Sequence, residues 1–529
     1  MTNVAEIAQT ALAEVATEIV QPGSPVAETV ETSADWLRTL TAWVDVADGW
    51  VWGLPLIGAV LVTGMLLTFM LRFVHVFNLK RAFRYMFRPE TDADVKGEVS
   101  QFGALCTALS ATIGTGNIVG VATAIGTGGP GALFWMEVAA FFGMATKYAE
   151  GLLAVKYREV LPDGRVLGGP FYYIERGLGR KWKWLAVLFA FFGVTAGIMG
   201  IGTIAQIHGI TSAVQRFFDP GFNPSDVATG LQLFGTTYSV PVVVAGLVVT
   251  MCVGLVVIGG IKRISAVSTV VVPFMAVFYV AICAFILLGN LSKVTAAVEL
   301  VVRAAFNPAA FTGGVVGSLF IAMQKGVARG IFSNEAGLGS APIAAAAART
   351  NEPTRQGLVC MTGTFIDTIV VCTMTGLAIV VTGAWEPSLK LEGVDITIEA
   401  FNRGLAFLPH ARSIAPCFLM VAITFFAFTT ILGWDYYSER CLEYLVGVKR
   451  QWAVKLYRLL YVLVVFAGPY LTVSVVWGIA DVFNGLMAFP NLIALVLLSP
   501  VVVRTTRDYF RRTAPAPGGR ARSGSDGPG

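Results

Sequence analysis

Residues 110–120 read SATIGTGNIVG, and this short stretch decides how the chain must be built. It lies inside a longer apolar run, yet it combines three glycines with serine, threonine and asparagine, which are poor helix formers. If the run crosses a bilayer, such a segment either packs closely against a neighbouring helix or unwinds beside a cavity. Gly116 and Gly120 form the GxxxG pair that packing prefers. Packing does not require Asn117 there, so we predict an unwound segment.

Composition places this run in a membrane protein. The chain has 529 residues, of which 55% are hydrophobic and 13% charged, whereas a soluble domain carries about 25% charged residues. A spanning helix needs about 20 mostly apolar residues. We therefore predict an all-α polytopic protein with eleven spans, near residues 52–73, 103–125, 131–155, 184–215, 240–259, 265–289, 313–345, 358–383, 414–437, 456–476 and 479–503.

Basic residues predict the orientation of these spans. With the N-terminus outside and the C-terminus in the cytoplasm, inside segments hold 28 Lys and Arg residues and outside segments seven. This asymmetry follows the positive-inside rule. We predict that an N-terminal extension over residues 1–50 is partly disordered. We predict that a basic tail over residues 506–529 is disordered.

A second interrupted span is predicted in residues 320–337, which read FIAMQKGVARGIFSNEAG. Lys325, Arg329 and Glu335 are costly at membrane depth unless they are paired or face water. The two interrupted spans lie five helices apart, so a second unit would enter the membrane from the opposite side. Matched interruptions in two inverted halves point to a transport site at the membrane midplane. We predict a transporter domain over residues 51–505, with an extra N-terminal helix and basic loop at 52–101 and repeats at 102–290 and 313–505.

The predicted site suits a zwitterion and a cation. Unwinding frees N–H groups at a half-helix N-terminus, which attracts a carboxylate, and frees carbonyl groups that suit a cation. Thr429 and Thr430 add hydroxyl groups in the ninth span, although such threonines usually bond their own backbone. Glu150 and Asp367 are read as structural or gating partners, with a coupling role as the alternative. Lys147 is expected to extend to the inner surface.

Four strings give the chain a family resemblance: ATIGTGNI at 111–118, GGPGALFWM at 128–136, GMATKYAE at 143–150 and FSNEAGLGSAP at 332–342. With these strings, residues 50–505 resemble the alanine or glycine:cation symporter family. The resemblance implies a leucine-transporter-type five-plus-five inverted repeat in the cytoplasmic (inner) membrane, with sodium-coupled uptake of alanine or glycine. It implies substrate contacts from Thr115, Gly116, Asn117, Gln206, Phe320, Met323 and Trp434.

By the same resemblance, the sodium site uses backbone carbonyls of Ser110 and Ile113 and hydroxyls of Thr429 and Thr430. Sodium is then the coupling ion, with no organic cofactor and no nucleic-acid partner. Proton coupling in the same fold is the main alternative. Three other classes of protein are disfavoured. A channel would need a ring of like residues, a receptor a soluble signalling domain, and an enzyme a recognisable catalytic motif, and the sequence shows none of these features.

Overall fold

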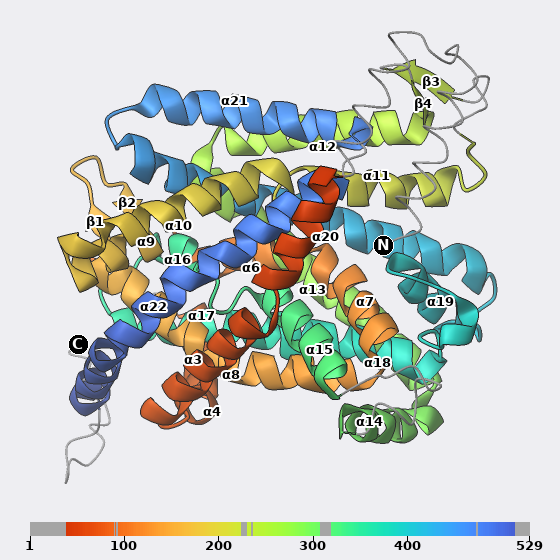
Figure 1. The fold of residues 1–529 in the computed structure, drawn as a ribbon, viewed down its shortest axis with the longest axis horizontal. Coiled ribbons are helices and arrows are strands. Elements are labelled where there is room, and N and C mark those ends of the chain that lie inside the picture. Colours follow the sequence, from red (N-terminus) through yellow and green to blue (C-terminus); the bar gives the residue numbers. More distant parts are fainter. Residues whose placement is uncertain are drawn as a thin grey trace, which may run out of the picture.

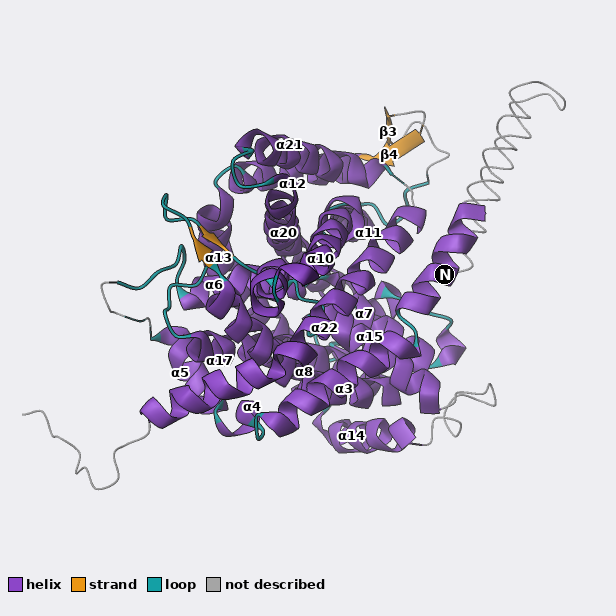
Figure 2. Cartoon of the chain, turned by 60° about the vertical axis from the view of Figure 1, so that its left-hand side comes forward, coloured by secondary structure: helices purple, strands orange, loops and turns teal. Residues whose placement is uncertain are grey.

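The computed structural model describes residues 39–88, 90, 94–223, 230–233, 236–306, 319–471 and 474–513. These residues are almost entirely helical, with two small hairpins at the surface (Figure 2). Within them, nine helices are long and apolar enough to cross a membrane, or ten when one bent pair counts as a span. The predicted all-α polytopic fold is confirmed at this level. Part of the predicted span 313–345 lies outside the described residues, as do residues 1–38 and 514–529 of the predicted extension and tail.

The first described helix lies against the last one. The stretch Thr39–Met70 consists of a helix over residues 39–51 and α3 (Leu54–Met70), with an extended Gly53 between them. Val44 and Val51 on this stretch pack against Gly478 and Gly485 of α22 (Ser474–Thr513), and Figure 1 shows the two running side by side. Residues 39–50 are therefore helical, although the sequence suggested an extension.

The first half of the bundle begins with a bent pair. Its helices are α6 (Gln101–Thr112), α7 (Val119–Gly128), α8 (Gly131–Tyr157), α10 (Lys183–Ala196), α11 (Ile204–Phe218), α12 (Val240–Val257) and α13 (Gly260–Gly289). Two short helices, α4 (Val74–Phe77) and α5 (Leu79–Phe87), lie between α3 and α6. The buried helix α9 (Pro170–Tyr173) and two antiparallel hairpins, β1 (Glu159–Val160) with β2 (Val166–Leu167) and β3 (Gly230–Leu233) with β4 (Thr236–Ser239), lie between later helices.

The second half has a similar set of long and short helices. These are α15 (Leu319–Asn334), α16 (Ala341–Ala345), α17 (Pro353–Thr364), α18 (Thr373–Thr382), α20 (Ala411–Val446), α21 (Gln451–Ala467) and α22. Two further helices lie outside the predicted spans, α14 (Leu291–Phe306) and α19 (Val394–Gly404). Because α22 continues to Thr513, the predicted disordered tail is wrong for residues 506–513.

Two predicted spans contain irregularities that the sequence did not indicate. The span at 184–215 is divided into α10 and α11 by a π-helical turn, Gly197–Ile201, in which Gly200 leaves the helical conformation. The span at 358–383 contains a π-helical segment, Phe365–Cys372, between α17 and α18. A π-helical segment widens the helix and redirects its side chains, and such segments are frequent at functional sites. Here it carries Asp367 into the centre of the bundle.

Candidate functional site

The first interruption lies where the sequence predicted it. Helix α6 ends at Thr112, and α7 departs from it at an angle of 63° after a 3-10 turn, Thr115–Asn117. The backbone N–H of Gly114 donates to Asn117 Oδ1 at 2.9 Å, which closes the turn. A Cβ atom at Gly114 would lie 2.6 Å from Thr430 Oγ1, so α20 approaches the interruption as closely as it does only because this residue is glycine.

The second interruption is present but lies later than predicted. Helix α15 runs unbroken to Asn334, and the irregular segment is residues 335–340. Glu335, Gly337 and Gly339 adopt left-handed backbone conformations there, which only glycine tolerates readily. Asn334 Oδ1 accepts from the N–H of Ala336 at 2.9 Å. Lys325 and Arg329 therefore lie on an intact helix, before the interruption.

Asp367 connects the two interruptions. Its Oδ1 accepts from Asn117 Nδ2 at 2.8 Å, in the first interruption. Its Oδ2 accepts from the Ser333 hydroxyl at 2.9 Å, at the end of α15, and from the Thr368 hydroxyl at 2.7 Å. All four side chains are buried. A buried carboxylate is costly unless hydrogen bonds satisfy it, and these bonds hold the two broken helices to one point.

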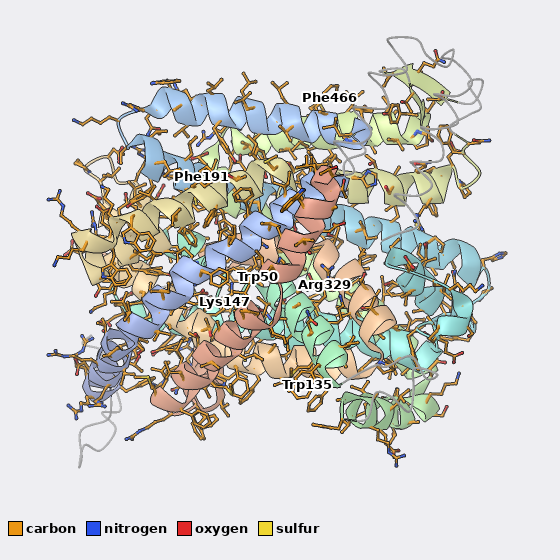
Figure 3. The ribbon with its side chains drawn as sticks, in the orientation of Figure 1. Trp50, Trp135, Lys147, Phe191, Arg329 and Phe466 are labelled. Atoms are coloured by element: carbon orange, nitrogen blue, oxygen red, sulfur yellow. The ribbon has the colours of Figure 1, made fainter. Side chains whose placement is uncertain are left out.

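A further buried charge cluster lies on α8 beneath the second interruption. Glu150 Oε1 accepts from Asn491 Nδ2 at 2.7 Å and from the N–H of Gly337 at 3.2 Å. Lys147, one turn earlier, lies close enough to Glu150 and Glu335 to attract both carboxylates. The side chain of Lys147 is 3% exposed and lies in the middle of the bundle (Figure 3). The expectation that Lys147 extends to the surface is therefore wrong.

A cavity of about 350 Å³ ends on the first interruption. Thr115 and Gly116 form part of its wall, together with residues of α7, α11, α15, α19, α20 and α22. The cavity reaches the surface at Arg216, whose guanidinium pairs with Asp395 of α19. Both of these side chains are more than 40% exposed, so the cavity extends from the membrane interior to one face of the protein.

The structure brings some of the predicted substrate residues together. Thr115, Gly116 and Gln206 line the cavity, with Thr115 Oγ1 3.4 Å from Gln206 Oε1. Gln206 Nε2 donates to the carbonyl of Ile201 at 3.0 Å, so its carbonyl oxygen is turned toward Thr115. Asn117 lies directly behind this wall, where its amide is engaged with Asp367.

The other predicted substrate residues lie away from this wall. Trp434 is fully buried beside Gly202, outside the cavity lining. Phe320 is 59% exposed on the first turn of α15, and Met323 packs against the main core cluster. We expected both to face the pocket from the second interruption, but they lie three to four turns before it because α15 is continuous. Phe332 and Arg329 occupy the cavity wall in their place.

Of the predicted sodium ligands, Thr430 lies where α20 contacts the end of α6, whereas the Thr429 hydroxyl lies 3.5 Å from Met275 Sδ of α13. The hydroxyls of Thr429 and Thr430 both donate to the carbonyl of Phe426, at 3.0 and 2.9 Å. Thr430 Oγ1 also faces Gly114, and a Cβ at Gly433 would lie 2.8 Å from Ser110 Oγ. The last carbonyls of α6 have no intrahelical partner because the helix stops there. Oxygen atoms of this kind suit a hard cation, so the residues present fit sodium.

The opposite face of the bundle, where α8 ends, is closed by backbone contacts. We call it the basic face, because it carries the loops in which the Lys and Arg residues concentrate. The N–H groups of Glu98 and Val99 donate to the carbonyl of Ala347, at 2.8 and 3.2 Å, and the N–H of Arg349 donates to the carbonyl of Val99 at 2.7 Å. These bonds join the segment before α6 to the segment after α16.

The Arg158 guanidinium completes this closure. It donates to the carbonyls of Ala346 and Ala348, both at 2.7 Å, to Thr350 at 2.6 Å and to Lys96 at 2.9 Å. Burial lowers the pKa of Arg158 to about 10, an effect that the carboxylate of Glu90 opposes. The guanidinium is therefore charged at neutral pH, and it holds four carbonyl groups together.

A multi-pass helical bundle with interrupted helices and a cavity that ends on one of them is the architecture of a secondary transporter. The chain is thus an integral membrane protein of the transporter class. Residues 37–518 match the sodium:alanine symporter family, and the chain belongs to this family.

Three curated relatives agree with this assignment. An uncharacterized transporter of Haemophilus influenzae is 52% identical, over 90% of this chain and 97% of its own. The sodium/alanine symporter AgcS of Methanococcus maripaludis is 45% identical, over 88% of this chain and 96% of its own. The putative sodium/proton-dependent alanine carrier protein YrbD of Bacillus subtilis is 36% identical, over 87% of this chain and 91% of its own.

Sequence reasoning missed several residues of the cavity wall. Asp481 lies in the last predicted span, and an acid there is a signal that was available, since such residues are rare and functional in membranes. Val394 and Ile398 line the cavity from α19. That helix lies in a loop between two spans, and its contribution depends on tertiary packing that no local pattern reveals.

Replacing Asp367 by alanine should loosen both interruptions. The change removes the carboxylate that accepts from Asn117 Nδ2 and from the Ser333 and Thr368 hydroxyls, at about 1–3 kcal/mol for each group left unsatisfied. Asn117 Nδ2 keeps its 3.2 Å bond to the backbone carbonyl of residue 367. We expect a lower Tm in detergent and loss of alanine binding. The control is Glu399→Ala, which removes a half-exposed carboxylate from an i,i+4 pair with Arg403 and should cost at most about 1 kcal/mol. Equal Tm values for the two variants would contradict this role of Asp367.

Replacing Arg158 by glutamine should open the basic face. The variant loses the fork that holds four carbonyls, so amides in residues 345–350 should exchange with deuterium at least about tenfold faster, a change equivalent to ~1.4 kcal/mol. Arg263→Gln provides the matched control, because Arg263 donates to a single carbonyl, that of Leu255. Unchanged protection of residues 345–350 in Arg158→Gln would show that the guanidinium does not close this face.

Proposed function

We propose that this chain is a sodium-coupled symporter that carries small neutral amino acids, alanine or glycine, into the cell by alternating access. The observation that carries the proposal is the position of the first interruption, whose Thr115 and Gly116 form the inner end of the cavity. The hydrogen bonds of the described residues leave the N–H groups of Thr115 and Gly116 unused. They precede α7, whose N-terminal end carries partial positive charge.

The proposed substrate carboxylate lies against these N–H groups. An interrupted helix then supplies binding donors that an intact helix would consume internally. Gln206 Oε1 lies beside Thr115 and accepts from the substrate ammonium group. Family membership and the name of the relative AgcS support alanine as substrate and sodium as the coupling ion. Glycine is included because it differs from alanine only by the absence of one methyl group.

Sodium in this proposal binds between α6 and α20. Its ligands are the backbone carbonyls of Ser110 and Ile113 and the hydroxyls of Thr429 and Thr430. Thr430 faces Gly114, which adjoins the substrate-binding Thr115. An ion at this position orders the same residues that bind the substrate, which provides a coupling free energy between the two sites.

Orientation and repeat symmetry belong to the same proposal. The N-terminus lies outside and the C-terminus in the cytoplasm, as the asymmetry of basic residues indicates. The basic face is then cytoplasmic, and the cavity opens to the outside of the inner membrane. Residues 102–290 and 313–505 form the two inverted repeats, each of which begins with an interrupted helix. Alternating access would open the contacts made by Arg158 and close the cavity.

Uptake of labelled alanine into proteoliposomes tests the transport function. We expect accumulation with an inward sodium gradient and none when potassium replaces sodium. Gly116→Leu should abolish uptake by filling the cavity, whereas Gly116→Ala should retain it, because a Cβ there meets its nearest atom, Phe332 Cδ1, at an ordinary 3.5 Å.

Uptake that does not depend on sodium and follows a pH gradient would instead establish proton coupling. This alternative is favoured by the buried acids around Lys147 and by the name of the relative YrbD, a putative sodium/proton-dependent alanine carrier.

Thr430→Ala tests the ion site. Loss of one ligand hydroxyl should weaken the apparent sodium affinity by about tenfold, or ~1.4 kcal/mol, while the protein still folds. Thr424→Ala is the matched control, because Thr424 lies on the same helix and bonds its own backbone in the same i−4 manner, at 2.8 Å to Met420. Sodium dependence that is the same in both variants would remove Thr430 from the site.

A further inference from the structure

A second cavity, of about 120 Å³, lies next to the first one. Three elements form it: the N-terminal helix over residues 39–51, α15 and α22. Arg329, Phe332 and Asp481 line both cavities, so these three side chains are the partition between them. The remaining wall residues are Asp48, Gly49, Trp52, Gln324, Lys325 and Ala328.

The wall of this smaller cavity carries two charges of each sign. Asp48 and Asp481 supply carboxylates, and Lys325 and Arg329 supply cations. None of the four belongs to an ion pair within 4 Å among the described residues. Asp48 Oδ1 is buried and has no hydrogen-bond partner in the same part of the chain. The acids and the cations attract one another across the cavity without closing into a direct ion pair, so their polar groups face the cavity.

Aromatic contacts fix the shape of the partition. Trp52 Nε1 donates to the backbone carbonyl of Asp481 at 3.0 Å, which fastens the N-terminal helix to α22. The Trp52 ring meets the Phe332 ring edge to face, with centroids 6.1 Å apart. The Arg329 guanidinium lies over the Phe332 ring, 5.6 Å from its centroid. Aromatic side chains thus contact Arg329 and the backbone of Asp481.

We propose that this cavity is a second, outer binding site for a zwitterionic small amino acid. The wall carries two carboxyl groups and two cationic side chains, so it offers a partner to both the carboxylate and the ammonium group of one zwitterion. The carboxylate lies between Lys325 and Arg329, and the ammonium group faces Asp48 and Asp481. The volume equals that of about four water molecules at ~30 Å³ each, which suits a ligand the size of alanine.

This inference rests on the proposed function and adds a step to it. The substrate binds first in the outer site and then passes the partition formed by Arg329, Phe332 and Asp481 to reach Thr115 and Gly116. The N-terminal helix, which precedes both proposed repeats, thereby contributes Asp48, Gly49 and Trp52 to substrate capture.

Equilibrium binding of labelled alanine to the purified full-length protein, in sodium and carried to saturation, tests the outer site. The wild-type chain should bind two molecules. Gly49→Leu should bind one, because Gly49 is part of the cavity wall and the added side chain should take up space there. A Cβ at this position meets no atom within 4 Å, so the fold should not be disturbed. Gly58→Leu makes the same change in equally open space on α3, away from both cavities, and should bind two.

A charge variant tests the proposed contact with the ammonium group. Asp48→Asn should weaken the outer site by about tenfold or more, and Asp163→Asn, which changes an exposed acid between β1 and β2, should leave it unchanged. One bound molecule in the wild-type chain, or two in Gly49→Leu, would overturn the outer site and leave sodium-coupled transport intact. Absence of sodium-dependent alanine binding in the wild-type chain would overturn the proposed function itself.

Discussion

The carboxylate of Asp367 is the point on which both interrupted helices depend. Each interruption leaves backbone groups without helical partners inside the bundle. In the first interruption, Asn117 Oδ1 accepts from the N–H of Gly114, and Asn117 Nδ2 donates to the Asp367 carboxylate. The Ser333 hydroxyl, at the end of α15, donates to the same carboxylate. A movement at one interruption is therefore transmitted to the other through a single side chain. This provides a physical link between the first interruption, where both proposed sites lie, and the end of α15, which supplies Phe332 to the cavity wall.

The two faces of the bundle differ in a way that defines the state of this structure. On one face, a cavity runs from the Arg216–Asp395 pair down to Thr115. On the basic face, the Arg158 guanidinium and the backbone bonds around Ala347 leave the corresponding route closed. Hydrogen bonds from a charged donor contribute about 1.5–3 kcal/mol each. Opening the basic face in the proposed cycle breaks these bonds. The free-energy cost must therefore be offset by new contacts that form where the cavity closes.

The sequence predicted features that depend on local composition. Glycines and an asparagine within an apolar run indicated the interruption around Gly114, and the structure has it there. The second interruption was placed too early because Lys325 and Arg329 resembled residues of a broken span, whereas they face cavities from an intact helix. For the same reason, Phe320 and Met323, which we expected in the cavity wall, lie outside it. The burial of Lys147 depends on neighbours far away in the chain, which hydropathy does not report.

The most direct measurement is an experimental density map of the protein with alanine and sodium bound. The account predicts amino-acid density against the N–H groups of Thr115 and Gly116, and a compact ion density between the end of α6 and Thr430. The carboxylate of Asp367 should contact both interruptions in the same map. A map in which residues 112–118 form a continuous helix, or in which alanine binds away from that segment, would contradict the account.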